Sequence, residues 1–414
     1  MSKKQISPFI LLCGTGMFAI FSSTMSKNPV LPLFTKALGA SDSIIGIVAA
    51  SSTIIGILVS LPAGVLSDFY GRRRVLLFSA FVFASAPFLY FLVHAPWQLA
   101  IVRVYHGIAT AIFGPVAMAV VADLFKERRA ENMGWYSSST LVGRSLAPLA
   151  GGLIIQFRNF KYVYLGCGVA GITAFILAFM IPLKHEPRLT SNRFSDKLKE
   201  MGKGLKEIGK SKGIMVTSIV EAVQYLSFGA LETFLPLYCK FIAKIGYAEI
   251  GTLFMIQLLG TTITKPVMGR LSDKYGRKLM ISLGLIIGAF ALAIIPFFKS
   301  FWALIPPAIM FGISLATVTA STSAYVSDLA KAGSYGSALG VMSTIMDIGH
   351  SSGPIISSQL LTHGSGIAMK IFPNRNVSGI EGVSYITMFL IVSAVLFLAG
   401  VLFPILSGKE RHET

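Results

Sequence analysis

Apolar segments long enough to cross a bilayer recur along almost the whole chain, and they constrain the fold more than any other feature. A helix needs about 20 mostly apolar residues to span the hydrocarbon core, and twelve such segments are present. Only 13% of the residues are charged, against about a quarter in a soluble domain, so we predict an all-α membrane protein and not a soluble enzyme. The predicted spans are 8–33, 44–66, 75–94, 97–123, 132–156, 161–182, 213–239, 248–269, 279–298, 302–327, 335–361 and 381–406.

The positive charge follows the predicted topology. The chain has 36 Lys and Arg against 18 Asp and Glu, a formal net charge of +18, which is compatible with either nucleic acid or a membrane surface as partner. Most of these cations fall in alternate connections, as the positive-inside rule expects of cytoplasmic loops. We therefore expect a lipid bilayer and no nucleic acid as partner, a multi-pass protein of a plasma or inner membrane with both termini cytoplasmic, and function as a monomer.

The chain repeats itself at a nearly constant offset. GVLSDFYGRRR from Gly64 recurs as GRLSDKYGRK from Gly269, so that Asp68 matches Asp273 at 205 residues. Further matches at offsets of 204 to 206 join Leu31 to Leu235, Asp123 to Asp328, Gly134 to Gly340 and Pro148 to Pro354. We predict two pseudo-symmetric six-helix bundles, residues 1–183 and 213–414, joined by a basic cytoplasmic linker, residues 184–212.

The repeated motif resembles the signature of the major facilitator superfamily, and the resemblance extends over essentially the whole chain. It implies the major facilitator fold and a conformational latch on the cytoplasmic side that breaks when the protein opens inward. The alternative is that the basic run only sets topology. The latch residues are Gly64, Asp68, Gly71, Arg72 and Arg73, and in the second copy Gly269, Asp273, Gly276 and Arg277.

Two further segments resemble motifs of the same family. Arg103 and Gly107 in RVYHGIATA resemble a motif in which a buried Arg is associated with proton coupling, with His106 at the place of the usual Gln. The alternative for Arg103 is a side chain that snorkels to the outer interface. GRSLAPLAGGLI resembles the antiporter signature of the drug-exporting branches and favours export over import; its residues are Gly143, Pro148, Gly151 and Gly152.

The ionisable residues inside the spans are the candidates for proton coupling, because charge within a membrane is costly and is usually functional. Glu221 and Glu232 are eleven residues apart, about three helical turns, and share one face with Tyr225. We interpret them either as proton carriers or as counter-ions to Lys27 and Arg103.

A second group of candidates joins the two halves. The repeat places His350 opposite Arg144, with Asp347 one turn earlier, and an Arg144–Asp347 pair is expected either to break during transport or to be permanent. The candidates for the substrate cavity are Lys27, Asn28, Arg103, His106, Tyr225 and Glu232.

We therefore predict a proton-coupled secondary transporter, most like the drug:proton antiporters, that exports a small amphipathic drug or metabolite by alternating access. The alternatives are a proton symporter or uniporter for a small, possibly anionic metabolite, and a membrane receptor that transports nothing. No Walker-type phosphate loop and no metal-ligand cluster occurs in the sequence, so no cofactor is expected and the proton gradient is the expected energy source.

Overall fold

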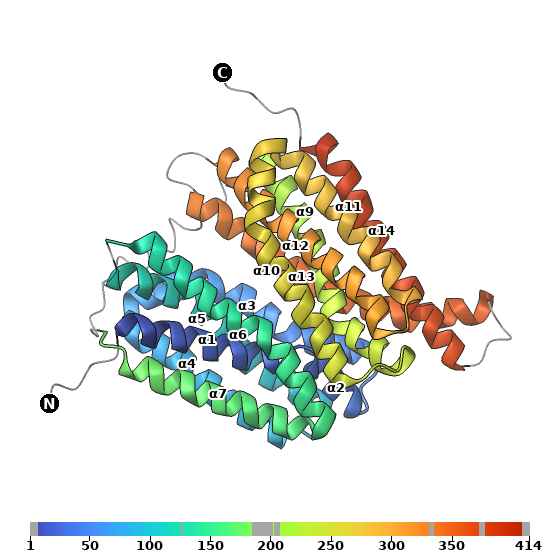
Figure 1. Cartoon of the computed structure of the whole chain (residues 1–414), viewed down its shortest axis with the longest axis horizontal. Helices are drawn as coiled ribbons and strands as arrows, with labels where there is room; N and C mark the ends of the chain where they lie inside the picture. The colour runs from blue at the N-terminus through green and yellow to red at the C-terminus, as the bar shows by residue number, and fades with distance from the viewer. Residues whose placement is uncertain are drawn as a thin grey trace. The chain divides into compact units, whose positions relative to one another are not determined.

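The computed structural model describes residues 7–125, 127–183, 202, 208–330, 335–371 and 377–407, and these form helices and connections without a strand (Figure 1). The first half contains α1 (Pro8–Met25), α2 (Val30–Ala37), α3 (Asp42–Tyr70), α4 (Arg72–Leu89), η1 (Tyr90–Leu92), α5 (Pro96–Leu124), α6 (Arg129–Phe157) and α7 (Phe160–Met180). The second contains α9 (Lys212–Leu237), η2 (Tyr238–Ile242), α10 (Tyr247–Tyr275), α11 (Arg277–Ile294), η3 (Ile295–Phe297), α12 (Phe301–Leu329), α13 (Tyr335–Ile371) and α14 (Val377–Leu406). The predicted linker, residues 184–212, lies mostly outside the described residues.

The first predicted span, 8–33, is wrong as a single helix. The structure breaks it after Met25 and begins α2 at Val30. Pro29 has no amide proton and disfavours the helical conformation of the residue before it, which favours a break at Asn28, although Pro148 is accommodated inside α6. Lys27 and Asn28 consequently lie in a turn, in which the Asn28 amide donates to the Thr24 carbonyl at 2.9 Å.

Ten helical segments in the described part of the chain are long and apolar enough to cross a membrane. They include α1 and α2 taken together, but neither α10 nor α13. These two helices carry polar residues in mid-span, such as Gln257 and Lys265 in α10 and Asp347 and His350 in α13. Their low hydropathy therefore follows from the polar residues that they carry in mid-span.

The two halves repeat their helix boundaries and their packing. From α3, α4 and α5 to α10, α11 and α12, both ends of each helix are displaced by 205 residues. The packed pairs α1–α6, α1–α7, α4–α5 and α4–α7 of the first half recur as α9–α13, α9–α14, α11–α12 and α11–α14 in the second. This repeated packing confirms the pseudo-symmetric bundles predicted from the sequence.

The chain packs into two compact units, and two helices, α3 and α10, are each divided between them. One unit contains α1, α2 and α4–α7, together with α3 from Ser51 onward and Tyr247–Met255 of α10. The other contains α9 and α11–α14, the rest of α10, and Ser41–Ala50. The predicted boundaries assign each helix to one bundle as a whole, and they stay a prediction.

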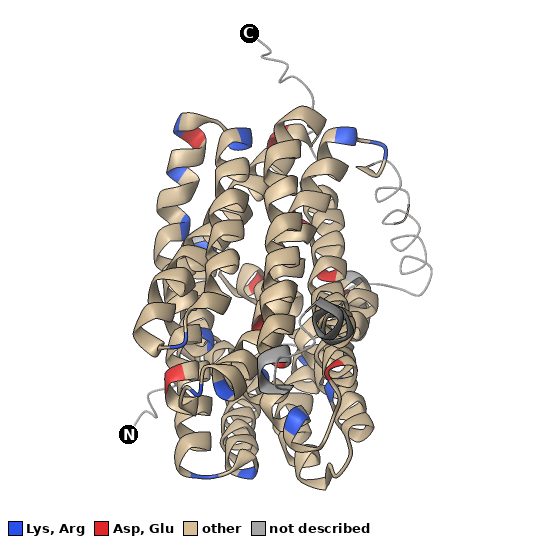
Figure 2. Cartoon of the chain, turned by 90° about the vertical axis from the view of Figure 1, so that its right-hand side faces the viewer, with Lys and Arg blue, Asp and Glu red and all other residues tan. Residues whose placement is uncertain are grey.

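The exterior of the helices is apolar in the way that a lipid-facing surface requires. Trp97 and Trp302, at repeat-related positions in the first turns of α5 and α12, are 64% and 76% exposed, as expected of aromatic side chains at the membrane interface. Figure 2 shows long stretches of helix without charge, with most charged residues near helix ends and connections.

Candidate functional site

In the C-terminal unit, glycines bring α9 and α13 into close contact. A Cβ atom on Gly349 would collide with the Ala222 carbonyl, and one on Gly353 with the Leu226 carbonyl. Small residues at such positions let two membrane helices approach backbone to backbone. Side chains on the facing surfaces of α9 and α13 are therefore held close together.

This contact brings Glu232 and His350 together. Glu232 Oε2 lies 2.9 Å from His350 Nε2, and the two side chains are only 7% and 15% exposed. From the sequence we predict both residues as candidates for proton coupling, with Glu232 alternatively a counter-ion to Lys27 or Arg103 and His350 opposite Arg144. The structure shows that these two candidates contact each other.

Two aromatic rings contact the imidazole of the Glu232–His350 pair. The Phe228 ring stacks on the imidazole with centroids 5.6 Å apart and an interplanar angle of 13°. Tyr225, a predicted cavity residue, meets the same imidazole edge-on at 6.0 Å. The pair therefore lies in surroundings of low polarity, where a change in its net charge is energetically costly.

The second predicted carboxylate, Glu221, belongs to a different polar group of the same unit. It is 2% exposed, interacts with the Thr322 hydroxyl and with the charge of Lys265, and its Oε2 has no hydrogen-bond partner among the described residues. Nearby, the Ser314 hydroxyl donates to Gln224 Oε1 at 3.5 Å. Glu221 and Glu232 thus have different polar partners.

In the N-terminal unit, Arg103 is buried at 4% exposure and does not snorkel to the interface. Its Nη2 donates to Ser52 Oγ at 2.6 Å and its Nη1 to Tyr90 Oη at 3.5 Å. Tyr90 Oη lies 3.4 Å from His106 Nδ1, and the Tyr90 ring stacks on Tyr164 at 4.1 Å. We call these five residues the Arg103 cluster.

The latch motif forms the same three-residue cluster in each half. Arg72 is paired with Asp68 at 3.3 Å and with Asp123 at 2.7 Å. Arg277 is paired with Asp273, and its Nε lies 3.2 Å from Asp328 Oδ2. Each arginine, at the start of α4 or α11, therefore joins the C-terminal end of α3 or α10 to the C-terminal end of α5 or α12.

The other motif residues act locally. Gly71 and Gly276 form the turns before α4 and α11 with φ of +90° and +94°, a conformation that favours glycine. Gly64 and Gly269 lie within α3 and α10. Arg73 does not join the Asp–Arg–Asp cluster: it donates to the carbonyls of Phe179, Ile181 and Leu183 at the end of α7.

The antiporter-like residues lie along α6, where Pro148 is inside the helix. A Cβ on Gly143 would collide with the Met17 carbonyl of α1, and one on Gly151 would lie 3.1 Å from Val30 Cγ2 of α2. Gly152 packs against Tyr247 and Gly251, in the part of α10 that belongs to the same unit. Gly143 and Gly151 therefore serve packing within the N-terminal unit.

The remaining candidates are placed individually. Asn28 is buried at 5% exposure and Lys27 is half-buried in the turn before α2. Arg144 is exposed on α6, and Asp347 is half-buried on α13. The Arg144–Asp347 pair would join the two units and stays a prediction.

The polar contacts of both sites were missed because they depend on which helices are neighbours. A signal was nevertheless available: the repeat relates Glu232 to Lys27 and His350 to Arg144, so α9 and α13 correspond to α1 and α6. Expecting α9 and α13 to be neighbours would have brought Glu232 and His350 together. Ser52, Tyr90 and Tyr164 carry no charge, and no sequence signal marked them.

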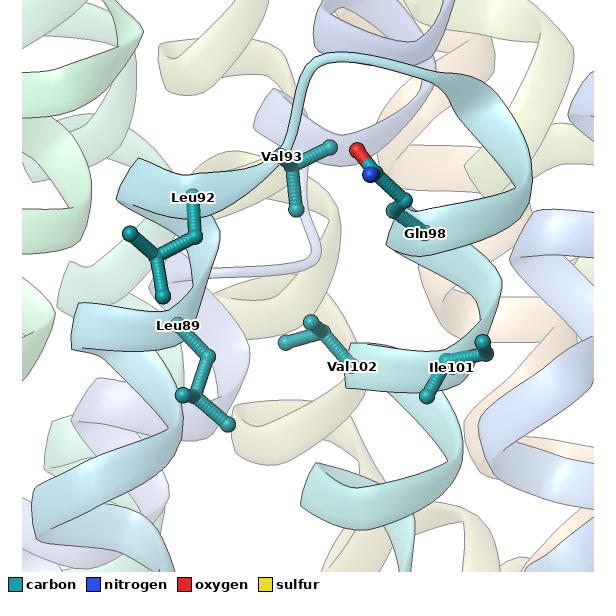
Figure 3. Close-up of a pocket in the computed structure, with 6 residues that line it drawn as sticks. All are labelled: Leu89, Leu92, Val93, Gln98, Ile101 and Val102. Atoms are coloured by element: carbon teal, nitrogen blue, oxygen red, sulfur yellow. The ribbon is translucent and has the colours of Figure 1, made fainter.

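A shallow depression of about 240 Å³ lies beside the Arg103 cluster, between the end of α4 and the start of α5 (Figure 3). Its one polar side chain, Gln98, already accepts from the amides of His94 and Ala95. The depression is therefore mainly apolar, and the side-chain oxygen of Gln98 is already engaged at the start of α5. Its lining residues are Leu89, Leu92, Val93, Gln98, Ile101 and Val102.

The family model of the Major Facilitator Superfamily matches residues 12–246 and 217–414. An uncharacterized MFS-type transporter of Methanocaldococcus jannaschii is 25% identical over 351 residues, covering 83% of this chain and 86% of that protein. Quinolone resistance protein NorA of Staphylococcus aureus is 24% identical over 349 residues, covering 83% and 87%. The crystal structure of a bacterial homologue of the human lysosomal transporter Spinster superposes with a TM-score of 0.80 at 15% identity, covering 98% of both chains.

The fold and the matches define a multi-pass membrane protein of the transporter class. The chain belongs to the Major Facilitator Superfamily, whose members are membrane transporters for small molecules rather than enzymes.

Proposed function

We propose that this chain is a proton-coupled secondary transporter that exports a small amphipathic molecule by alternating access. The observation that carries the proposal is the buried Glu232–His350 contact, 2.9 Å long and with two aromatic rings against the imidazole. A carboxylate and an imidazole in contact form a site that can take up and release a proton.

The contact also offers a way to couple proton occupancy to helix movement. With one proton shared, the pair has no net charge; gain or loss of a proton leaves a net charge among Tyr225 and Phe228. Such a charge is costly in apolar surroundings, so each protonation step favours a different arrangement of α9 and α13. Glu221, buried near Lys265, is the second proposed proton carrier.

The duplicated Asp–Arg–Asp clusters are the proposed latch. They hold α3, α4 and α5 together at one end, and α10, α11 and α12 at the corresponding end. With these ends and both termini cytoplasmic, in a plasma or inner membrane, their ion pairs would rearrange as the transporter opens inward. We propose that a monomer suffices, with Lys27, Asn28, Arg103, His106, Tyr225 and Glu232 facing the substrate path during the cycle.

The direction of transport is supported by two observations. The α6 motif with Gly143, Pro148, Gly151 and Gly152 resembles that of drug exporters. The name of the relative NorA refers to quinolone resistance, which is compatible with efflux as the shared activity.

The test is transport in proteoliposomes with an imposed pH gradient, using a panel of fluorescent amphipathic dyes and a quinolone. We expect flux of at least one compound that collapses with the gradient, and a loss of about tenfold or more in Glu232→Gln and His350→Asn. Glu131→Gln, at a 56% exposed side chain on α6, is the matched control and should transport normally. Flux that is independent of the gradient and unchanged in Glu232→Gln would overturn the coupling.

A symporter or uniporter for a small anionic metabolite is the second candidate, because the N-terminal unit buries Arg103, which has no carboxylate partner among the described residues. The two functions are separated by the direction of transport. In a proton-coupled exporter, substrate and protons cross the membrane in opposite directions, whereas in a symporter they cross in the same direction.

A further inference from the structure

The charge of Arg103 is not balanced by any described residue. Its polar partners are the hydroxyls of Ser52 and Tyr90, and the ion pairs formed by described residues do not include it. Removing a guanidinium from water costs several kcal/mol unless an opposite charge compensates. Two hydroxyl groups supply hydrogen bonds but no charge.

Hydrogen-bonding capacity remains unused in the same place. Arg103 Nε, His106 Nε2 and Tyr164 Oη are all buried without a hydrogen-bond partner among the described residues. Buried polar atoms are nearly always paired, and an exception calls for a bound water or ion. Three unused atoms around one uncompensated cation favour an ion of negative charge over water alone.

The repeat shows that the fold itself does not require this polar cluster. The positions equivalent to Tyr90, Arg103 and His106 in the second half are Ile295, Ala308 and Phe311, and all three are buried. The packing beneath them is the same in both halves: Gly107 lies against the Ser52 carbonyl, and Gly312 against the carbonyl of Gln257. The equivalent of Ser52 is the buried amide Gln257, so the same helix arrangement is satisfied there without a buried charge.

From these observations we infer that the Arg103 cluster binds an anionic group, a carboxylate, a phosphate or a halide. The guanidinium supplies the charge and can present two parallel N–H groups to an oxyanion, and the Tyr90 and Tyr164 hydroxyls add donors. The anion is either a free inorganic ion or the acidic group of the transported molecule; the second source rests on the proposed transport function.

The binding test uses the full chain, purified in lipid nanodiscs, without any need for a transported substrate. The thermal midpoint is measured against sodium chloride, acetate and phosphate at constant ionic strength, with the bulky sulfonate HEPES as the balancing anion. We expect a saturable rise of about 3 °C or more with at least one probe. Arg103→Gln should lose this rise, while Arg158→Gln, at an exposed arginine that follows α6, should keep it.

A second variant protects the result against misfolding of Arg103→Gln. Tyr90→Phe keeps the cation and the stacked ring but removes one donor to a charged group, so the half-saturating concentration should rise about tenfold. The inference is overturned if the wild-type protein shows no specific response to any probe, as water alone would give, or if Arg103→Gln responds as the wild type does.

The two sources of the anion are separated by competition. If the substrate's own acidic group binds, the effective probe inhibits transport of an acidic substrate and not of its methyl ester. If a free ion binds, the thermal response occurs without any effect on transport. If anions bind but no compound is transported, the proposed transport function is refuted and the anion site is supported. If compounds are transported but no anion changes the thermal midpoint, the anion site is refuted and the transport function is supported.

Discussion

The two halves of this transporter share a backbone plan and differ in what they bury. The N-terminal unit buries Arg103 and His106, where the C-terminal half has Ala308 and Phe311. The C-terminal unit contains Glu232 and His350, where the N-terminal half has Lys27 and Arg144. Because equivalent positions accept such different side chains, the polar groups are not needed to specify the fold.

What the halves keep in common is close packing. Gly107 and Gly312 allow the same approach of two helices, and Gly143 and Gly349 another. The comparison teaches that the helix contacts set the architecture and that the intervening polar positions are available for function. Four sets of substitutions test this division.

The largest effect is expected from Ala308→Arg, which puts a guanidinium at the position equivalent to Arg103. The equivalents of Tyr90 and His106 are Ile295 and Phe311, and of the described equivalents only the amide of Gln257, at the position of Ser52, can accept from the guanidinium. A buried charge with one neutral partner should still cost several kcal/mol. We expect little monodisperse protein by size-exclusion chromatography.

Ala308→Met is the control for added volume and should fold. Adding Ile295→Tyr and Phe311→His to Ala308→Arg should recover part of the folded fraction. If Ala308→Arg alone behaves as Ala308→Met does, the two halves do not differ in their tolerance of buried charge.

Next in size is the removal of the latch arginines. The carboxylates around Arg72 are 21% and 24% exposed, whereas those around Arg277 are 65% and 56% exposed. Less water around the first cluster means less screening, so Arg72→Ala should cost about 2 kcal/mol and Arg277→Ala less than about 1 kcal/mol. The difference is read from denaturant unfolding, with the exposed Arg74→Ala as a control; equal losses would contradict the ranking.

Alanine at the packing glycines is expected to cost about 1–3 kcal/mol, because a methyl group must be forced between backbones. Gly143→Ala and Gly349→Ala meet the carbonyls of Met17 and Ala222. Gly134→Ala and Gly340→Ala, also related by the repeat, project into open space and should be neutral or stabilising by up to about 1 kcal/mol. Thermal midpoints of all four proteins check this, and similar values for both pairs would refute it.

The smallest effect is expected from Arg73→Lys. Arg73 donates to three carbonyls at the end of α7, while its repeat equivalent, Lys278, lies 5.8 Å over the Tyr325 ring. One ammonium cannot reproduce the fork of guanidinium donors, so a loss of about 0.5–1 kcal/mol and faster hydrogen exchange in the last turn of α7 are expected. Unchanged exchange there would show that the contacts do not stabilise the helix end.

The fold could be predicted largely from sequence because membrane spans and repeats leave strong local signals. The break before α2 was also available, since Pro29 marks it, but the apolar run obscured it. The hydropathy of α10 and α13 is low because both carry polar residues in mid-span, such as Lys265 and His350. The repeat supports their assignment as spans, because it relates α10 to α3 and α13 to α6 at a nearly constant offset.

The site was predictable as a set of residues and not as a set of contacts. Glu232, His350 and Arg103 stand out because ionisable groups are rare in spans. Their partners depend on helix neighbours and rotations that hydropathy does not encode, so the Glu232–His350 contact and the role of Tyr90 come from the structure.

The helices α3, α4 and α5 have the same lengths as their counterparts α10, α11 and α12. Segments of one half can therefore replace the equivalent segments of the other. Residues 90–106 can be exchanged for 295–311 without any insertion or deletion, and the reverse chimera is equally in register. Each half thus provides a natural variant of the other. Tyr90, Arg103 and His106 can be moved together into the second half, where their function can be measured at the equivalent position of the same protein.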